Sequence, residues 1–255
     1  INIPPRIYIL RYAKNISCAM IYDRTCNCEG TEQLRFTDII EKKVTELNKR
    51  NYQKELDKLI DNIKKEEKVP RLFLHSCCAP CSSYVLEYLS QYFEITVFFY
   101  NPNISLVEEY SKRVAEIRRL IAEMSFVHPV HIEEGTYDPQ VFYEMAKGME
   151  KVPEGGERCF KCYRLRMEEA ARLAQKDNYD YFTTTLSISP LKNAEKINEI
   201  GEELAEIYKV PHLPSDFKKK NGYKRSIELS HEYNLYRQNY CGCAFSKREQ
   251  EEKMK

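Results

Sequence analysis

Seven of the ten cysteines in this 255-residue sequence fall into three tight groups, and clustered thiols either bind metal or carry out redox chemistry. The groups are Cys77, Cys78 and Cys81, then Cys159 and Cys162, and finally Cys241 and Cys243. A disulfide framework is not expected in a chain of this size, because its first residues lack the uninterrupted apolar run of a secretory signal. We therefore expect free thiols in a cytoplasmic protein.

Cys159 and Cys162 stand three positions apart at the start of a predicted helix, so both sulfurs should lie on one face. The positive end of the helix favours the thiolate, which is the form that ligates metal. Two cysteines can also pack as small apolar side chains. That simpler interpretation is less favoured, because the two cysteines are surrounded by the cations Arg158, Lys161 and Arg164. A CxxC pair on its own fits zinc, iron–sulfur and redox sites alike.

The first group contains a second CxxC pair, Cys78 and Cys81, shortly after the apolar run of residues 72–74. A strand that leads into CxxC and then a helix is typical of thioredoxin-like proteins, so thiol–disulfide exchange by Cys78 and Cys81 is one alternative. Cys77 is extra to that motif, and strands and helices go on alternating well beyond it. Two pairs of thiolates can instead form a four-sulfur site for zinc or an iron–sulfur cluster. A zinc-stabilised RNA-binding domain is therefore a second alternative.

Cys241 and Cys243 form a CxC pair, which can close a small and strained disulfide ring. Strained disulfides are the labile, catalytic kind, although two free thiols near the end of the sequence would have the same spacing. The segment that leads to this pair, residues 216–243, interleaves basic residues with tyrosines. Basic side chains neutralise phosphates and aromatic rings stack on unpaired bases, but such a pattern is also usual for a solvated helix face.

Alternating strands and helices should position these thiols. Apolar runs predict buried strands over 71–76, 95–101, 130–134 and 180–188. Helical periodicity predicts helices over 107–124, 138–149, 159–175, 194–210 and 223–237, with one more beginning near residue 51 and another at Pro80. This order predicts a Rossmann-like (doubly wound) α/β fold, with a mostly parallel sheet, helices on both faces and a helical C-terminal segment.

We expect three parts along the chain: an extension of uncertain order (1–47), one α/β domain (48–246) and a charged tail (247–255). The net charge of +1 argues neither for nor against nucleic acid, and no apolar run is long enough to cross a bilayer. In doubly wound sheets, ligands bind at the carboxyl ends of the strands. Three segments that follow predicted strands should therefore lie together along one edge, or rim, of the sheet: HSCCAPC, YNPN and TLSISPLKN.

Taken together, several segments resemble the epoxyqueuosine reductases of the QueH family. They are HSCCAPC, YNPNI, ERCFKCY, TTLSISPLKN, DFKKKNGYKRS and YRQNYCGC, and the resemblance runs from about residue 48 to about residue 246. It implies a Rossmann-like iron–sulfur reductase with a [4Fe–4S] cluster and an adjacent mononuclear iron. The implied reaction reduces epoxyqueuosine at the wobble position of tRNA to queuosine, which is the last step of queuosine biosynthesis. The electron donor is not implied.

Carried over position by position, the resemblance implies roles for the individual cysteines. Cys77, Cys78, Cys159 and Cys162 would ligate the cluster, Cys81 would ligate the second iron, and Cys241 and Cys243 would be a redox-active pair. The partner would be tRNA that bears epoxyqueuosine in its anticodon, with the modified base splayed into a pocket. The expected tRNA contacts are Lys218, Lys219, Lys220, Lys224, Arg225 and Tyr236.

Overall fold

The computed structural model describes residues 50–66 and 68–254. All the described elements belong to one compact unit, Asn51–Lys255. The extension predicted over 1–47 lies outside the described residues. The first described element is helix α2, Tyr52–Ile63, which begins where the Asn51 side chain accepts a hydrogen bond from the Lys54 amide at 3.1 Å.

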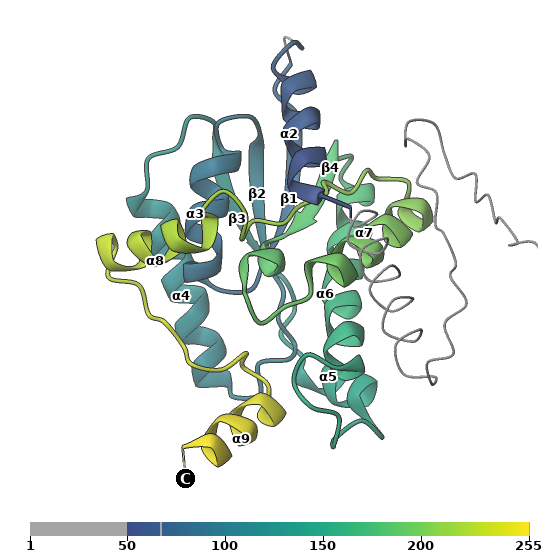
Figure 1. The fold of residues 1–255 in the computed structure, drawn as a ribbon, viewed down its shortest axis with the longest axis vertical. Helices are drawn as coiled ribbons and strands as arrows, with labels where there is room; N and C mark the ends of the chain where they lie inside the picture. Colours follow the sequence, from purple (N-terminus) through teal and green to yellow (C-terminus); the bar gives the residue numbers. More distant parts are fainter. Residues whose placement is uncertain (1–49, 67, 255) are drawn as a thin grey trace, which may run out of the picture. The chain divides into compact units, whose positions relative to one another are not determined.

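Four parallel strands form the sheet, in the order β3-β2-β1-β4 (Figure 1). Their bounds are Arg71–Ser76 (β1), Glu94–Phe99 (β2), Val130–Glu134 (β3) and Tyr181–Thr184 (β4). The chain moves outward from β1 to β3 and then returns to place β4 on the other side of β1, with His75 opposite Thr184. The topological switch point is therefore at the carboxyl ends of β1 and β4, and the predicted parallel α/β sheet is confirmed.

Helices cover both faces of this sheet (Figure 1). Side chains of β1 alternate: Leu72 and Leu74 join the core beneath helices α3 (Ala79–Leu89) and α4 (Val107–Glu123), whereas Phe73 joins the opposite core. That second core is made with α6 (Glu157–Lys176) and α7 (Ala194–Tyr208). Further helices are α5 (Pro139–Ala146) and α8 (Gly222–Glu232), which packs on α3. The predicted doubly wound arrangement is thereby confirmed.

The fourth strand is shorter than predicted. It ends at Thr184, and residues Thr185–Ile188 form the 3₁₀-helix η1 instead of the second half of a strand. The Thr184 hydroxyl accepts a hydrogen bond from the Leu186 amide at 3.2 Å, which turns the chain out of the sheet. The apolar pattern of this segment is the same in a buried strand and a buried turn, so the prediction of a strand over 180–188 was wrong beyond Thr184.

The C-terminal helices also differ from the predicted bounds. Helix α8 ends at Glu232 rather than at residue 237, because Asn234 takes a left-handed conformation with φ of 47°. The Leu235 amide then bonds the Ser230 carbonyl at 2.8 Å, which closes the helix end. Residues of the predicted charged tail lie in helix α9, Ala244–Lys253. In the described part of the chain, no helix is long and apolar enough to cross a membrane.

Candidate thiol site at the carboxyl edge of the sheet

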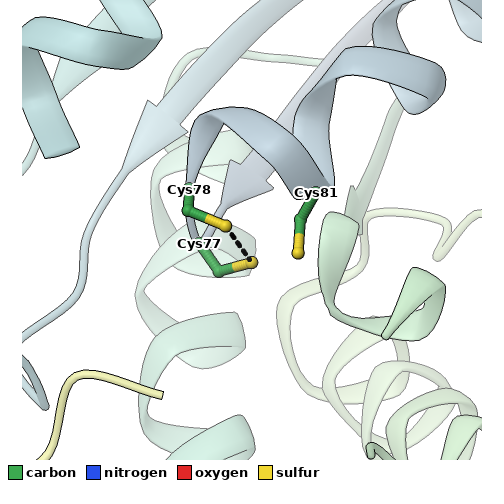
Figure 2. A group of neighbouring side chains, drawn as sticks. All are labelled: Cys77, Cys78 and Cys81. Atoms are coloured by element: carbon green, nitrogen blue, oxygen red, sulfur yellow. Dashed lines mark hydrogen bonds between the residues drawn. The ribbon is translucent and has the colours of Figure 1, made fainter. Parts of the chain in front are cut away.

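The first thiol group lies at the switch point, between the end of β1 and the first turn of α3. Cys77, Cys78 and Cys81 place their sulfurs within 4.8 Å of one another, and the sulfurs of Cys77 and Cys78 are 3.8 Å apart (Figure 2). Neighbouring side chains diverge on a strand, but both cysteines follow the end of β1, where Cys78 is the N-cap of α3. The sharp turn that adjacent ligands require is therefore present.

Hydrogen bonds from three elements fix this turn. The Cys77 amide donates to the Thr185 hydroxyl at 3.2 Å, and the Asn101 side-chain amide donates to the Ser76 carbonyl at 2.8 Å. The hydroxyls of Ser76 and Ser82 are 2.7 Å apart. Residues after β1, β2 and β4 thus meet at one edge of the sheet, as the sequence predicted for these segments.

The three thiols of this group differ in their pKa values. Hydrogen bonds from Cys78 and Cys81 hold the pKa of Cys77 well below its usual range. Cys78 and Cys81 must keep their protons to donate these bonds, so their pKa values rise. The hydrogen bond with Cys77 is the main cause in both, and it raises the pKa of Cys78 to about 11. Cys77 is therefore the thiol of this group that loses its proton most readily, and binding of a cation there would release protons from all three.

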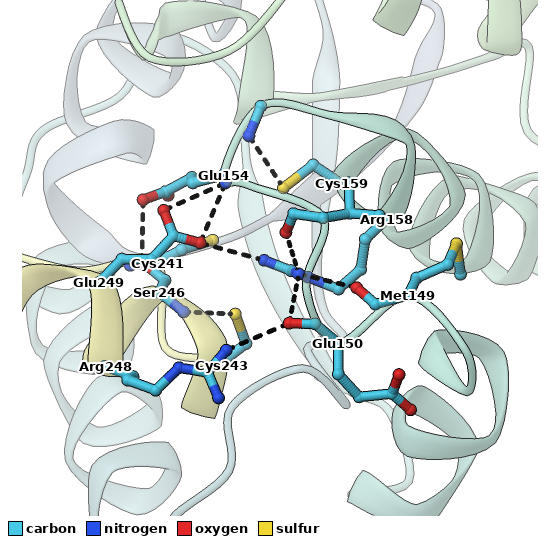
Figure 3. A network of polar contacts seen from close by, with 12 residues as sticks. Met149, Glu150, Glu154, Arg158, Cys159, Cys241, Cys243, Ser246, Arg248 and Glu249 are labelled. Atoms are coloured by element: carbon cyan, nitrogen blue, oxygen red, sulfur yellow. Dashed lines mark hydrogen bonds and ion pairs between the residues drawn. The ribbon is translucent and has the colours of Figure 1, made fainter.

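The other two groups share one small cavity of about 20 Å³. Cys159 lies in the first turn of α6, where its sulfur accepts a hydrogen bond from the Gly155 amide at 3.3 Å (Figure 3). Cys162 lies one turn further on and is buried, and Cys241 and Cys243 line the same cavity. The CxxC and CxC pairs, which are remote in sequence, therefore face the same small space.

A larger cavity of about 170 Å³ adjoins the small one and reaches the first thiol group. Cys78 and Cys81 line it, and four residues are common to the walls of both cavities: Glu154, Leu191, Lys192 and Cys241. The two cavities thus connect all three thiol groups. Among the described residues, however, the group of sulfurs within 4.8 Å of one another consists of Cys77, Cys78 and Cys81 alone, and Cys159 and Cys162 do not belong to it.

The CxC turn depends on its glycine. Gly242 has a φ of +113°, and a β-carbon there would lie 2.9 Å from the Ile104 side chain. The Arg113 guanidinium donates to the Cys241 carbonyl at 3.1 Å, and the Ser105 amide donates to the Gly242 carbonyl at 3.1 Å. Cys241 and Cys243 are free thiols. The turn is therefore held from outside by the loop after β2 and by α4, rather than by a bond between its own cysteines.

Three cations line the small cavity among the thiols, namely Arg158, Arg166 and Lys192. Arg166 on α6 is buried and donates to the Cys162 carbonyl at 3.2 Å and to the Asn101 side chain at 3.3 Å, but its Nη2 has no hydrogen-bond partner. Lys192 is half-buried and lines both cavities. Burial raises the pKa of Cys162 to about 11, while Arg166 acts against that rise. A buried guanidinium with a free donor beside four thiols suits an anionic group in this space.

Most of the residues expected to contact tRNA already have partners within the chain. Lys218 bonds the Ser187 carbonyl and Asp216, Lys220 pairs with Asp57 at 2.7 Å, and Arg225 pairs with Glu87 at 2.6 Å. The Tyr236 hydroxyl donates to Glu109 at 3.0 Å. Lys219 is exposed, and Lys224 makes only a long contact of 3.9 Å with Glu228. The basic segment instead lends other side chains to the larger cavity, namely Tyr223, Arg237 and Tyr240.

Sequence reasoning assigned no role to several residues of the site. Lys192 belongs to the segment after the fourth strand that was expected at the rim, and Arg166 follows Cys162 by four residues on the same helix face, so position could have found both. Glu154 lies in the loop just before the CxxC helix. Arg113 gave no signal, because charged residues on an amphipathic helix usually face solvent.

The fold and the site together define a class: a Rossmann-like α/β protein with metal- or redox-capable thiols at its topological switch point. Within this class the chain belongs to the QueH family, because the family model described as "Epoxyqueuosine reductase QueH" matches residues 72–249. A Staphylococcus epidermidis protein with that name is 44% identical over 200 residues, covering 77% of this chain and 84% of that protein.

Two further relatives carry the same name. The one from Staphylococcus aureus is 43% identical over 204 residues (78% of this chain, 85% of that protein), and the one from Streptococcus pyogenes is 40% identical over 198 residues (77% and 78%). A solved structure titled "AtPrR2 in apo form" matches with a TM-score of 0.28 and 16% identity, over 56% of this chain and 46% of that chain. That likeness is too low to carry an argument.

Proposed function

We propose that this protein reduces epoxyqueuosine at the wobble position of tRNA to queuosine, the last step of queuosine biosynthesis. The observation that carries the proposal is the meeting of three thiol groups, remote in sequence, on two adjoining cavities at the switch point of a QueH-family fold. The reaction removes one oxygen atom: two electrons and two protons enter, a carbon–carbon double bond forms, and water leaves. An enzyme for tRNA would act in the cytoplasm.

The residues fit an iron–sulfur cofactor. A [4Fe–4S] cluster with four thiolate ligands is anionic, and the space beside Cys159 and Cys162 contains the buried Arg166 with its unpartnered Nη2. In this proposal Cys77, Cys78, Cys159 and Cys162 hold the cluster, and Cys81 is a ligand of an adjacent mononuclear iron. The bound metals would supply electrons one at a time and a Lewis acid.

The chain itself would bind the base. The larger cavity offers Tyr223 and Tyr240 for stacking on the base and Arg237 for binding a phosphate. Cys78 and Cys81 line the same cavity. Cys241 and Cys243, when oxidised to a disulfide, would release two electrons and two protons, which equals the demand of the reaction. We propose that this pair is redox-active and that an external one-electron donor restores it.

Metal analysis on protein purified without oxygen tests the proposal, together with conversion of tRNA that contains epoxyqueuosine. We expect iron, acid-labile sulfide and formation of queuosine. Zinc at one equivalent without sulfide or conversion would favour a zinc-stabilised RNA-binding domain. Thiol–disulfide exchange that depends on Cys78 and Cys81 and requires no iron would favour the thioredoxin-like alternative. Burial of Cys78 and its raised pKa make it a poor attacking thiol.

A further inference from the structure

Glu154 stands between the two cavities of the thiol site. It lines both of them, and among the described residues that line either cavity it is the single aspartate or glutamate. It lies in the loop before α6 and is half-buried. The same cavity walls carry Cys78 and Cys81 on one side and Cys159 and Cys162 on the other. A carboxyl group at this place can reach a substrate that lies in the larger cavity.

The position of this carboxyl is fixed by its neighbours on α9 (Figure 3). The Glu154 amide donates to both carboxylate oxygens of Glu249, at 3.0 and 3.1 Å. The Ser246 hydroxyl donates to Glu154 Oε2 at 3.1 Å, and the same hydroxyl accepts a hydrogen bond from the Cys241 amide at 3.1 Å. In the described part of the chain no hydrogen-bond donor contacts Oε1, so one oxygen is held while the other remains available for a ligand.

The chemistry of epoxide removal needs such a group. Both bonds from carbon to the epoxide oxygen break, and an oxygen that departs without a proton is a poor leaving group. We propose that Glu154 is the general acid of this reaction and gives the first proton to the epoxide oxygen from its free carboxyl oxygen. This inference rests on the function proposed above.

Two electrons come from the Cys241 and Cys243 dithiol, which becomes a disulfide and releases its two protons to solvent. The external one-electron donor, used twice, reduces this pair again. The carbon atoms keep the two electrons in the new double bond. Glu154 gives one proton and becomes a carboxylate. It regains a proton from water through the mouth of the larger cavity, where Arg237 and Asn239 are exposed, and gives it to the oxygen, which leaves as water. The carboxyl is protonated again from solvent before the next turnover.

A purely structural role for Glu154 predicts a different outcome from a catalytic one. In Glu154→Gln the amide oxygen can still accept the Ser246 hydrogen bond, and the backbone contact with Glu249 does not involve the side chain. Only the transferable proton is removed. The matched control is Glu157→Gln, three residues further on, where the exposed carboxylate pairs only with Lys161 across 3.5 Å.

The experiment measures single-turnover conversion of epoxyqueuosine in tRNA, tRNA affinity, and iron and sulfide content for the oxygen-free wild type and both variants. We expect Glu154→Gln to react about 10²- to 10⁴-fold more slowly, with affinity and metal content unchanged, and Glu157→Gln to match the wild type. In Glu154→Ala, added formate should restore part of the rate in proportion to its concentration, because the larger cavity has room for it.

The outcomes separate the two proposals. A wild type that converts no epoxyqueuosine under any reductant would overturn the proposed function itself. A wild type that converts it while Glu154→Gln reacts equally fast would overturn only the role of Glu154. That role would also be overturned if the variants are slow but formate leaves Glu154→Ala as slow as before, since a small acid restores proton transfer but does not rebuild a structural hydrogen bond.

Discussion

Replacing Gly242 by alanine should destabilise the protein and displace the CxC turn. The residue has a φ of +113°, a conformation that costs a side-chain-bearing residue about 1–3 kcal/mol. The added β-carbon would also lie 2.9 Å from Ile104 Cγ1 and 3.2 Å from Arg113 Nη1, and overpacking of this kind costs about 1–3 kcal/mol. The expected loss in free energy of unfolding is therefore about 2–6 kcal/mol.

Gly148 provides the matched control. Its φ is +81°, but a β-carbon there would meet nothing within 4 Å, so Gly148→Ala carries the backbone cost alone. Denaturant unfolding of both variants and the wild type under oxygen-free conditions measures the difference. We expect Gly242→Ala to be less stable than Gly148→Ala by about 1–3 kcal/mol and to lose turnover as well. Equal stabilities would show that the turn has room for a side chain and that Ile104 and Arg113 do not enclose it.

Two further predictions concern the surface and the pH dependence of stability. Reversing the charge of Lys219 and Lys224 should weaken tRNA binding and flatten its dependence on salt, by a slope of about 0.7–0.9 for each phosphate that is no longer neutralised. An unchanged slope would show that neither Lys219 nor Lys224, which lies on α8, contacts the RNA. Burial holds the pKa of His212 at about 3, below the 6.5 of an unfolded chain, so the folded state binds fewer protons there. The stability this gives is present above about pH 6.5 and is lost as pH falls toward 3, by at most about 1.4 kcal/mol per pH unit. His212→Asn should make that loss shallower in unfolding experiments at neutral pH and at about pH 5, and an identical slope would contradict the assignment to His212.

Local patterns in the sequence were enough to locate the sheet and the rim, because each signal there is short-range. Apolar runs place β1, and the CxxC spacing puts Cys159 and Cys162 on one face of α6. Long-range contacts decide the rest. Nothing near Glu249 in sequence predicts that it would hold the amide of Glu154, and so α9 was expected to be a tail. The 3₁₀ turn after Thr184 was missed for a different reason. It depends on a local contact, in which a single hydroxyl bonds an amide two residues on, and the apolar pattern there is the same in a strand and in a turn.

The charged face of α4 shows why periodicity alone misplaced part of the site. Glu116 accepts a hydrogen bond from the Tyr236 amide at 2.7 Å, Arg119 donates to the Tyr233 carbonyl at 3.0 Å, and Arg113 donates to the Cys241 carbonyl. These residues recur every three positions along one side of the helix, which is also the pattern of a solvated face. Here they bind the backbone of residues 233–241 instead. Residues 237–241 of that segment line the larger cavity. Helix α4 therefore holds one wall of this cavity in place, including Cys241, although no cysteine lies on α4 itself.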